Sequence, residues 1–152
     1  MVDNLRIVRT IADYQFGSGA GKALFPESCE FLLSKNGKIR QILDKGKRIA
    51  TLKADTGLLT LSIEGARRLH SFFAFPKLRV VVANEVSEFI AEGKSVFAKH
   101  VVAVDENIRA NDEVLVVNEK DELLATGKAL LSAFEMLVLK RGVAVKVRQG
   151  VK

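Results

Sequence analysis

Apolar residues recur at helical spacing near the start of the chain. Leu5, Val8, Ala12 and Phe16 are three or four residues apart, which places them on one face of a helix over residues 4–16. The residues at its ends agree with these bounds, because Asp is a favoured N-terminal cap and Gly a favoured stop. These residues are Asp3 and Gly17. On the opposite face, three charged residues are expected to be solvated: Arg6, Arg9 and Asp13.

A different pattern follows. Residues 17–21 are rich in glycine and are predicted to form a loop. From Cys29 to Ser62, short β-prone runs are separated by turn signals at 36–37, 44–46 and 55–57, each ending in glycine. Because glycine adopts the positive φ that tight turns need, this stretch predicts an antiparallel meander of three or four strands.

Helical spacing returns after Ser62, which can cap a second helix that Pro76 ends. The apolar positions of this helix are Ile63, Ala66, Leu69 and Phe73. A small antiparallel sheet with one face covered by two helices is an α+β unit. The first half of the chain is therefore predicted to be such a unit, with its boundary near Pro76.

The second half reads mostly as strands. Residues 79–83 form a compact apolar run, and Asn84 can cap a short helix that Gly93 ends. Three apolar residues of that helix are expected to point inward: Val86, Phe89 and Ile90. Four further runs span 95–104, 113–117, 123–131 and 143–148. Five strands and one short helix predict a small barrel, so the chain divides into units 1–77 and 78–152.

The net charge of the chain is only a modest indication of its partners. The 152 residues carry 24 Lys and Arg against 18 Asp and Glu, and residues 1–78 hold 13 basic and 7 acidic residues, so the whole excess of +6 lies there. A basic surface favours polyanionic partners, but many proteins of this charge bind nothing charged, so charge alone favours an ordinary solvated surface. No apolar run is long enough to span a membrane and no secretory signal is visible, so a cytoplasmic location is expected.

Candidate catalytic chemistry is sparse. His70, His100 and the single Cys29 lack neighbours that would complete a metal site or a nucleophilic pair. The glycine-rich stretch 17–21 follows a helix rather than a strand and fails the known phosphate-loop patterns, so a connector is preferred over an anion site. We therefore expect no catalytic residues, no metal and no cofactor.

Several segments of the second half resemble a PUA domain, an RNA-binding fold named for pseudouridine synthases and archaeosine transglycosylases. The segments are RVVV at 79–82 with EVSEFI at 85–90, GKSVFAK at 93–99, IRANDEV at 108–114, ATGKA at 125–129 and KRGVAVKVR at 140–148. In the third segment, Asn111 replaces the glycine that is common in the family's turn. The resemblance implies a mixed β-barrel of the PUA type.

The first half resembles the accessory domain that precedes PUA in archaeosine tRNA-guanine transglycosylase. The segments are IADYQFG at 11–17, GAGKALFP at 19–26, IATLKA at 49–54 and GLLTL at 57–61. That family exchanges a guanine in tRNA by means of a zinc-bearing TIM barrel with catalytic aspartates. Such a barrel needs about 250 residues, and neither it nor its zinc motif is present in this sequence.

The resemblance therefore implies a non-catalytic tRNA-binding protein or subunit, which grips the acceptor stem and 3′ end and assists tRNA modification in the archaeosine pathway. Its expected partners are tRNA and a separately encoded transglycosylase or other archaeosine-pathway catalytic subunit. The alternative is a protein-interaction subunit that docks on such an enzyme with little RNA contact. Apolar patches left open on the folded surface would favour this alternative.

A PUA domain holds RNA against its glycine loop, second strand and closing strand. The resemblance nominates these residues: Gly93, Lys94, Ser95, Phe97, Ala98, Lys99, Arg141, Lys146 and Arg148. Glycine lets backbone N–H groups approach phosphate, cations neutralise it, and Phe97 offers a face for an unpaired base. Core packing of Phe97 and plain solvation of Lys99 remain open. A secondary basic surface, or ordinary exposed charge, is expected at Lys45, Lys47, Arg48, Arg67 and Arg68.

Overall fold

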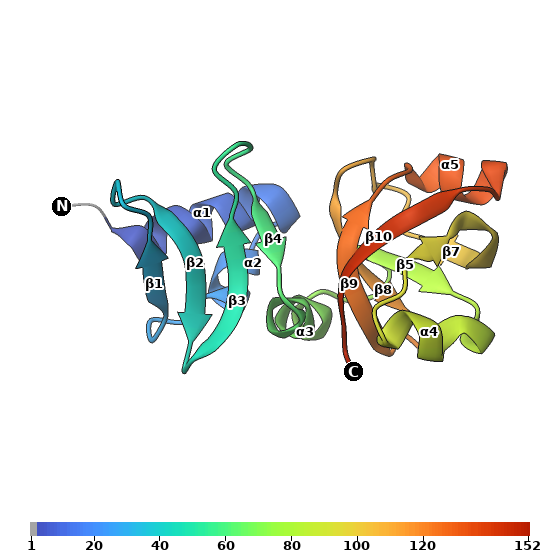
Figure 1. Cartoon of the computed structure of the whole chain (residues 1–152), viewed down its shortest axis with the longest axis horizontal. Coiled ribbons are helices and arrows are strands. Elements are labelled where there is room, and N and C mark those ends of the chain that lie inside the picture. The colour runs from blue at the N-terminus through green and yellow to red at the C-terminus, as the bar shows by residue number, and fades with distance from the viewer. Residues whose placement is uncertain (1–2) are drawn as a thin grey trace. The chain divides into compact units, whose positions relative to one another are not determined.

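The computed structural model describes residues 3–152 and separates them into two compact units (Figure 1). The first unit ends at Phe72 and the second spans Phe73–Lys152. Each unit has its own sheet and its own helices, so each is described by itself.

The first unit is a four-stranded antiparallel meander, as predicted, with strand order β1-β2-β3-β4. Two of its helices, α1 and α2, lie on one side of this sheet (Figure 1). The elements are α1 (Asn4–Phe16), α2 (Ala20–Leu24), β1 (Glu30–Leu33), β2 (Ile39–Asp44), β3 (Lys47–Leu52), β4 (Leu59–Leu61) and α3 (Ile63–Phe72).

Local chemistry sets the bounds of α1. The Asp3 side chain accepts a hydrogen bond from the Arg6 N–H at 3.2 Å, and Gly17 ends the helix with φ 128°. The predicted apolar face is confirmed, because α1 buries Val8, Ala12 and Phe16. They pack into the core of the unit with Leu24, Phe25, Ile42, Ile49, Leu59, Leu61 and Leu69.

The glycine-rich stretch is not only a loop, because α2 begins at Ala20. Gly21 lies so close to α1 that a Cβ there would collide with the backbone of Arg9. Across this crossing the Asp13 carboxylate accepts a hydrogen bond from the Gly21 N–H at 2.7 Å, and Arg9 Nε donates to the Phe25 carbonyl at 2.9 Å. Asp13 is exposed, as expected, whereas Arg9 is half-buried, and both side chains also join α1 to the segment that follows it.

The turn between β2 and β3 shows why the glycine signals predicted the meander correctly. Lys45 and Gly46 have φ of 51° and 82°, the pair of positive values typical of a type I′ hairpin turn. The second helix is shorter than predicted, because α3 ends at Phe72 and excludes Phe73. Pro76 therefore does not end it directly.

The second unit is built on a six-stranded mixed sheet with strand order β6-β10-β9-β8-β5-β7. β5 runs parallel to β8 and every other neighbouring pair is antiparallel. Its elements are β5 (Arg79–Val82), the 3-10 turn η1 (Asn84–Val86), α4 (Ser87–Ala91), β6 (Val96–Phe97), the 3-10 turn η2 (Ala98–His100), β7 (Val101–Val104), β8 (Glu113–Val117), β9 (Leu123–Ala129), α5 (Ala133–Leu139) and β10 (Val143–Gly150).

Chain connectivity forces this sheet to curl. β6 and β7 lie at opposite edges of the sheet, yet only Ala98–His100 separate them along the chain. Four residue steps reach about 14 Å at most, whereas the edges of a flat six-stranded sheet are about 24 Å apart. The sheet therefore bends around an apolar core that includes Val80, Val96, Val116, Met136 and Val145. The predicted α+β class with a PUA-type mixed barrel is confirmed, and the barrel takes the form of a curled six-stranded sheet.

Four details of the second unit differ from the predictions. The predicted run 95–104 is two strands, β6 and β7, separated by η2. Phe89 is 60% exposed rather than inward, although Ile90 of the same helix is buried. Asn84 does not cap a helix, because its side-chain oxygen accepts a hydrogen bond from the Glu119 N–H at 2.9 Å. The predicted elements also omit α5, although Ser132 and Glu135 form a capping box at its start.

Candidate nucleic-acid interface

The structure brings together the two stretches that sequence reasoning nominated, residues 93–99 and 141–148. β6 pairs antiparallel with β10, with Phe97 opposite Val143. Beside this pair, the Ala98 N–H donates to the Gly142 carbonyl at 2.9 Å, and the Val147 N–H donates to Ser95 Oγ at 3.2 Å. The stretches therefore form one continuous surface along β6 and β10.

The glycine loop itself offers less to a phosphate than expected. Gly93 has φ 109°, which favours glycine, and the space where its Cβ would lie is open. However, its N–H donates to the Ile90 carbonyl at 2.9 Å, and the Lys94 N–H donates to the Phe89 carbonyl at 3.1 Å. Both backbone donors are thus occupied within the domain, and recognition at this loop would depend on side chains.

Exposure separates the nominated residues into two groups. Phe97 is 50% exposed, so the alternative that it packs in the core is wrong. Ala98 is fully buried and Ser95 accepts the β10 hydrogen bond, so the side chains of these two residues support the fold. The exposed cations around Phe97 and β10 are Lys94, Lys99, Arg141 and Lys146.

Arg148 does not stand free beside Lys146. Its guanidinium forms a two-pronged ion pair with the Glu113 carboxylate on β8, in which Nη1 donates to Oε2 at 2.8 Å and Nη2 donates to Oε1. The Glu113 side chain is only 5% exposed, whereas that of Arg148 is 36% exposed. Arg148 therefore neutralises a buried carboxylate and supports the sheet.

Sequence reasoning missed Lys128. This residue lies on β9 directly opposite Lys146 of β10, and both side chains are exposed. Like charges at directly opposed positions destabilise a sheet, so an anion bound between the two lysines would stabilise this pair. On its other side Lys128 lies opposite Glu113, the carboxylate that Arg148 binds. The alternation of residues 123–129 indicated that Lys128 is exposed, but only the strand register shows that it lies opposite Lys146.

The secondary basic residues of the first unit fall into two environments. Four of them are exposed: Lys45, Lys47, Arg48 and Arg67. Arg68 is instead part of an internal network, in which it donates to Asp44 Oδ2 at 3.0 Å, to Glu64 Oε2 at 3.1 Å and to the Leu24 carbonyl at 3.0 Å. Through these contacts Arg68 links α3 to β2 and to the end of α2.

Asp44 is the anionic centre of that network. Ser28 Oγ donates to Asp44 Oδ1 at 2.7 Å, and the Arg68 guanidinium binds the second oxygen. These two hydrogen bonds, first that from Ser28 and then that from Arg68, lower the pKa of the Asp44 carboxyl below its ordinary value of 3.8. The carboxylate is therefore the stable form throughout the physiological range.

The Cys29 thiol is a poor nucleophile in this fold. Burial, followed by the nearby Asp44 charge, raises the pKa of the Cys29 thiol to about 11, which disfavours the reactive thiolate. No group of three or more His, Cys, Asp or Glu side chains is placed to hold a metal ion within residues 3–152. The helices of the same residues are too short or too polar to cross a bilayer.

The two units match two family models. Residues 6–76 match the patch-forming domain C2 of tRNA-guanine transglycosylase, and residues 78–151 match the PUA domain. The chain is a C2 domain followed by a PUA domain. The resemblance drawn from the sequence motifs is thereby confirmed for both halves.

Curated relatives place these domains in a larger protein. The chain is 54% identical over 147 residues to the tRNA-guanine(15) transglycosylase of Pyrococcus abyssi and 55% identical over 150 residues to that of Methanothermobacter thermautotrophicus. The match covers 97% and 98% of this chain but 25% and 23% of those proteins. The C2 and PUA domains thus span about a quarter of the length of the relatives.

Solved structures share the fold over nearly the whole chain. A hypothetical protein from Pyrococcus horikoshii OT3 superposes with a TM-score of 0.75 at 28% identity, covering 97% of this chain and 90% of that one. A conserved PUA domain protein from Thermoplasma acidophilum superposes with a TM-score of 0.64 at 24% identity, covering 95% and 86%. The second likeness concerns the fold alone.

Proposed function

We propose that this C2–PUA chain is a non-catalytic tRNA-binding protein or subunit that assists tRNA modification in the archaeosine pathway. The proposed RNA surface follows the adjacent strands β6, β10 and β9 of the PUA domain. It combines one exposed aromatic face, Phe97, with the opposed lysines Lys128 and Lys146. The names of the relatives, which are tRNA-guanine(15) transglycosylases, support tRNA as the nucleic acid.

The opposed lysines are the observation that carries the proposal. In the described chain neither ammonium group forms an ion pair with a carboxylate. Glu113 lies opposite Lys128 on the other side, so a bound anion would relieve the repulsion that remains at Lys146. A phosphate lying across β9 and β10 would neutralise both. Phe97, on the far side of β10, would stack on an unpaired base, and such stacking contributes about 1–3 kcal/mol per base.

We further propose that the tRNA element on this surface is the acceptor stem with its single-stranded 3′ end. Aromatic side chains bind bases that are free of pairing, and the 3′-terminal CCA of tRNA is such a segment. The exposed cations around Phe97 would follow the backbone that leads to it: Lys94, Lys99, Arg141 and Lys146.

The test is a titration of the purified chain with intact tRNA and with the same tRNA lacking CCA, at two salt concentrations. Contact with about five phosphates predicts a slope of log affinity against log salt of about −3.5 to −4.5. The Lys128→Ala/Lys146→Ala variant should flatten this slope by about two, because two cations are lost. The control is Arg109→Ala/Lys120→Ala, which removes two exposed cations from turns of the same domain.

Three results would contradict parts of the proposal. Equal losses of tRNA affinity in the two double variants would show that the β9–β10 lysines do not contact the RNA. Equal affinity for tRNA with and without CCA would show that the contact does not involve the 3′ end. A slope near zero for the parent chain would exclude nucleic acid as the ligand.

A second candidate function is supported by α5. This helix buries Ala133 and Met136 but leaves Phe134 73% and Val138 56% exposed. Its single charged residue, Glu135, is bound in the capping box and does not cover them. An exposed apolar face of this kind is typical of protein interaction sites, and the candidate partner is a separately encoded tRNA-modifying catalytic subunit.

Co-purification with that catalytic subunit tests this candidate. Phe134→Ser/Val138→Ser should abolish a complex that docks on α5 and leave tRNA affinity unchanged. A complex that survives this double substitution would show that α5 is not the docking surface.

A further inference from the structure

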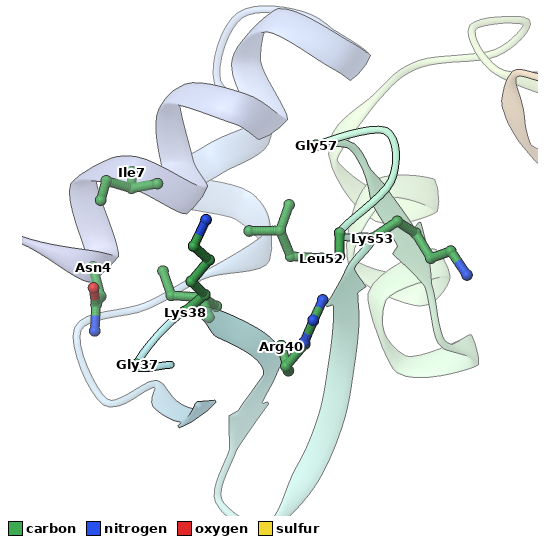
Figure 2. A pocket seen from close by; sticks show the side chains of 10 residues that line it. Asn4, Ile7, Gly37, Lys38, Arg40, Leu52, Lys53 and Gly57 are labelled. Atoms are coloured by element: carbon green, nitrogen blue, oxygen red, sulfur yellow. The ribbon is translucent and has the colours of Figure 1, made fainter. Parts of the chain in front are cut away.

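A cavity in the C2 domain combines positive charge with an apolar floor. It has a volume of about 380 Å³ and lies where the first turns of α1 meet the start of β2 and the end of β3 (Figure 2). Binding pockets for small molecules occupy about 300–1,000 Å³, so the cavity can hold a group of the size of one nucleotide.

The charged part of the cavity comes from β2 and the turn before it. Figure 2 shows the side chains of Lys38 and Arg40 reaching toward Leu52, whereas the ammonium group of Lys53 extends away from them. The ammonium of Lys38 and the guanidinium of Arg40 form no ion pair among residues 3–152, and none of the described residues that line the cavity is acidic. An anion entering the cavity would therefore meet two unneutralised cations.

The remaining wall is apolar. Ile7 of α1 faces Leu52 of β3 across the space, and Ala54 lines it from the β3–β4 turn (Figure 2). Ile7 is 38% exposed, so its side chain retains apolar surface that a ligand can cover. A ligand that is anionic at one end and flat and apolar at the other satisfies both halves of the cavity.

We propose that this cavity binds one unstacked nucleotide of the RNA, with its phosphate on Lys38 and Arg40 and its base against Ile7 and Leu52. This inference rests on the proposed RNA-binding function and adds a specific contact in the C2 domain. The fork of Arg40 suits two oxygens of one phosphate, and Lys38 supplies a second charge. The apolar wall favours a nucleotide over free phosphate, which would leave that wall uncovered.

Two variants and a matched control test the cavity by tRNA affinity. Lys38→Ala/Arg40→Ala removes its charge. Ala54→Trp fills it without altering charge, and we expect the variant to fold because Ala54 is exposed in a turn. Lys22→Ala/Lys35→Ala removes the same charge from exposed positions of the C2 domain that do not line the cavity. We expect each cavity variant to bind tRNA about tenfold more weakly than the control.

Direct binding is tested by methyl NMR on the parent chain, with adenosine and uridine 5′-monophosphate as probes. The methyl resonances of Ile7 and Leu52 should shift with either nucleotide, and less with inorganic phosphate or tetraglutamate at equal charge. Equal shifts with tetraglutamate would overturn the nucleotide assignment and favour an acidic peptide.

The outcomes separate this inference from the proposed function. Parent tRNA binding with equal affinities for the cavity variants and the control overturns the cavity alone. Absence of tRNA binding by the parent chain overturns both proposals. Weaker binding by Ala54→Trp together with nucleotide-dependent methyl shifts supports the cavity.

Discussion

Substitution of Arg148 tests whether this residue stabilises the PUA domain rather than binding RNA. In Arg148→Ala the Glu113 carboxylate, 5% exposed, loses the guanidinium that binds both of its oxygens. Removal of one partner of a buried pair destabilises a protein by about 3–5 kcal/mol. Because the Arg148 side chain is 36% exposed and water reaches it, we expect about 2–3 kcal/mol.

That loss is measurable as a thermal shift. For a domain of this size, 1 kcal/mol lowers Tm by about 4–8 °C, so Arg148→Ala should lower the Tm of the PUA domain by about 10–20 °C. Calorimetry measures the shift. Hydrogen exchange followed by mass spectrometry assigns it to peptides of β8, β9 and β10, which is needed because the chain has no Trp and its single Tyr, Tyr14, lies in the C2 domain.

Two further variants complete the experiment. Lys146→Ala removes an exposed cation from the same strand and should change stability by less than about 0.5 kcal/mol. Glu113→Gln in the Arg148→Ala background removes the uncompensated charge and should recover part of the loss. An Arg148→Ala protein as stable as the parent would refute the reasoning and return Arg148 to the list of free RNA contacts.

The remaining predictions concern three local features. Cys29 has a pKa of about 11 against an ordinary 9.0, so it carries about 100-fold less thiolate at neutral pH. A thiolate of higher pKa is a stronger nucleophile, which offsets part of this loss, so iodoacetamide should alkylate Cys29 about tenfold more slowly than a free thiol. An equal alkylation rate would contradict the burial of Cys29. Because the pKa of Asp44 is lowered, its contribution to stability is present above pH 3.8 and is lost as pH falls through its folded-state pKa. Urea unfolding should therefore show Asp44→Asn less stable than the parent at pH 6 and equally stable at the acid end. A difference in stability that does not change with pH would exclude the Ser28 and Arg68 contacts as the cause. Ser132→Ala should destabilise the PUA domain by about 1 kcal/mol because the N-terminal cap of α5 is lost, whereas Ser132→Thr keeps the cap and should not. Calorimetry of both variants tests this, and equal Tm values would show that the cap contributes nothing.

Much of the local structure could be predicted from sequence because neighbouring residues determine it. The bounds of α1 follow from apolar spacing, from a capping carboxylate at Asp3 and from the positive φ of Gly17. The β2–β3 turn follows likewise from Gly46. The capping box that opens α5 was legible too, since Ser132 and Glu135 have the required spacing, although the predictions did not use it.

The candidate RNA surface was predicted only in outline. Motif resemblance located the stretches around Phe97 and Lys146, and the structure places them on paired strands. It could not distinguish Lys146, which is exposed, from Arg148, which is bound to a carboxylate 35 residues away in sequence. Nor could it show that Lys128 faces Lys146, because strand register depends on packing across the whole sheet.

By itself, the sequence determined the bounds of α1, the positions of the hairpin turns and the division into a C2 and a PUA pattern, because these depend on interactions over three or four residues or on recurring motifs. Only the tertiary structure decided which charges are free. Arg9, Arg68 and Arg148 look like surface cations in the sequence, yet each is bound by a partner on another element. A side chain's availability depends on what long-range folding places beside it, and no local pattern encodes that neighbour.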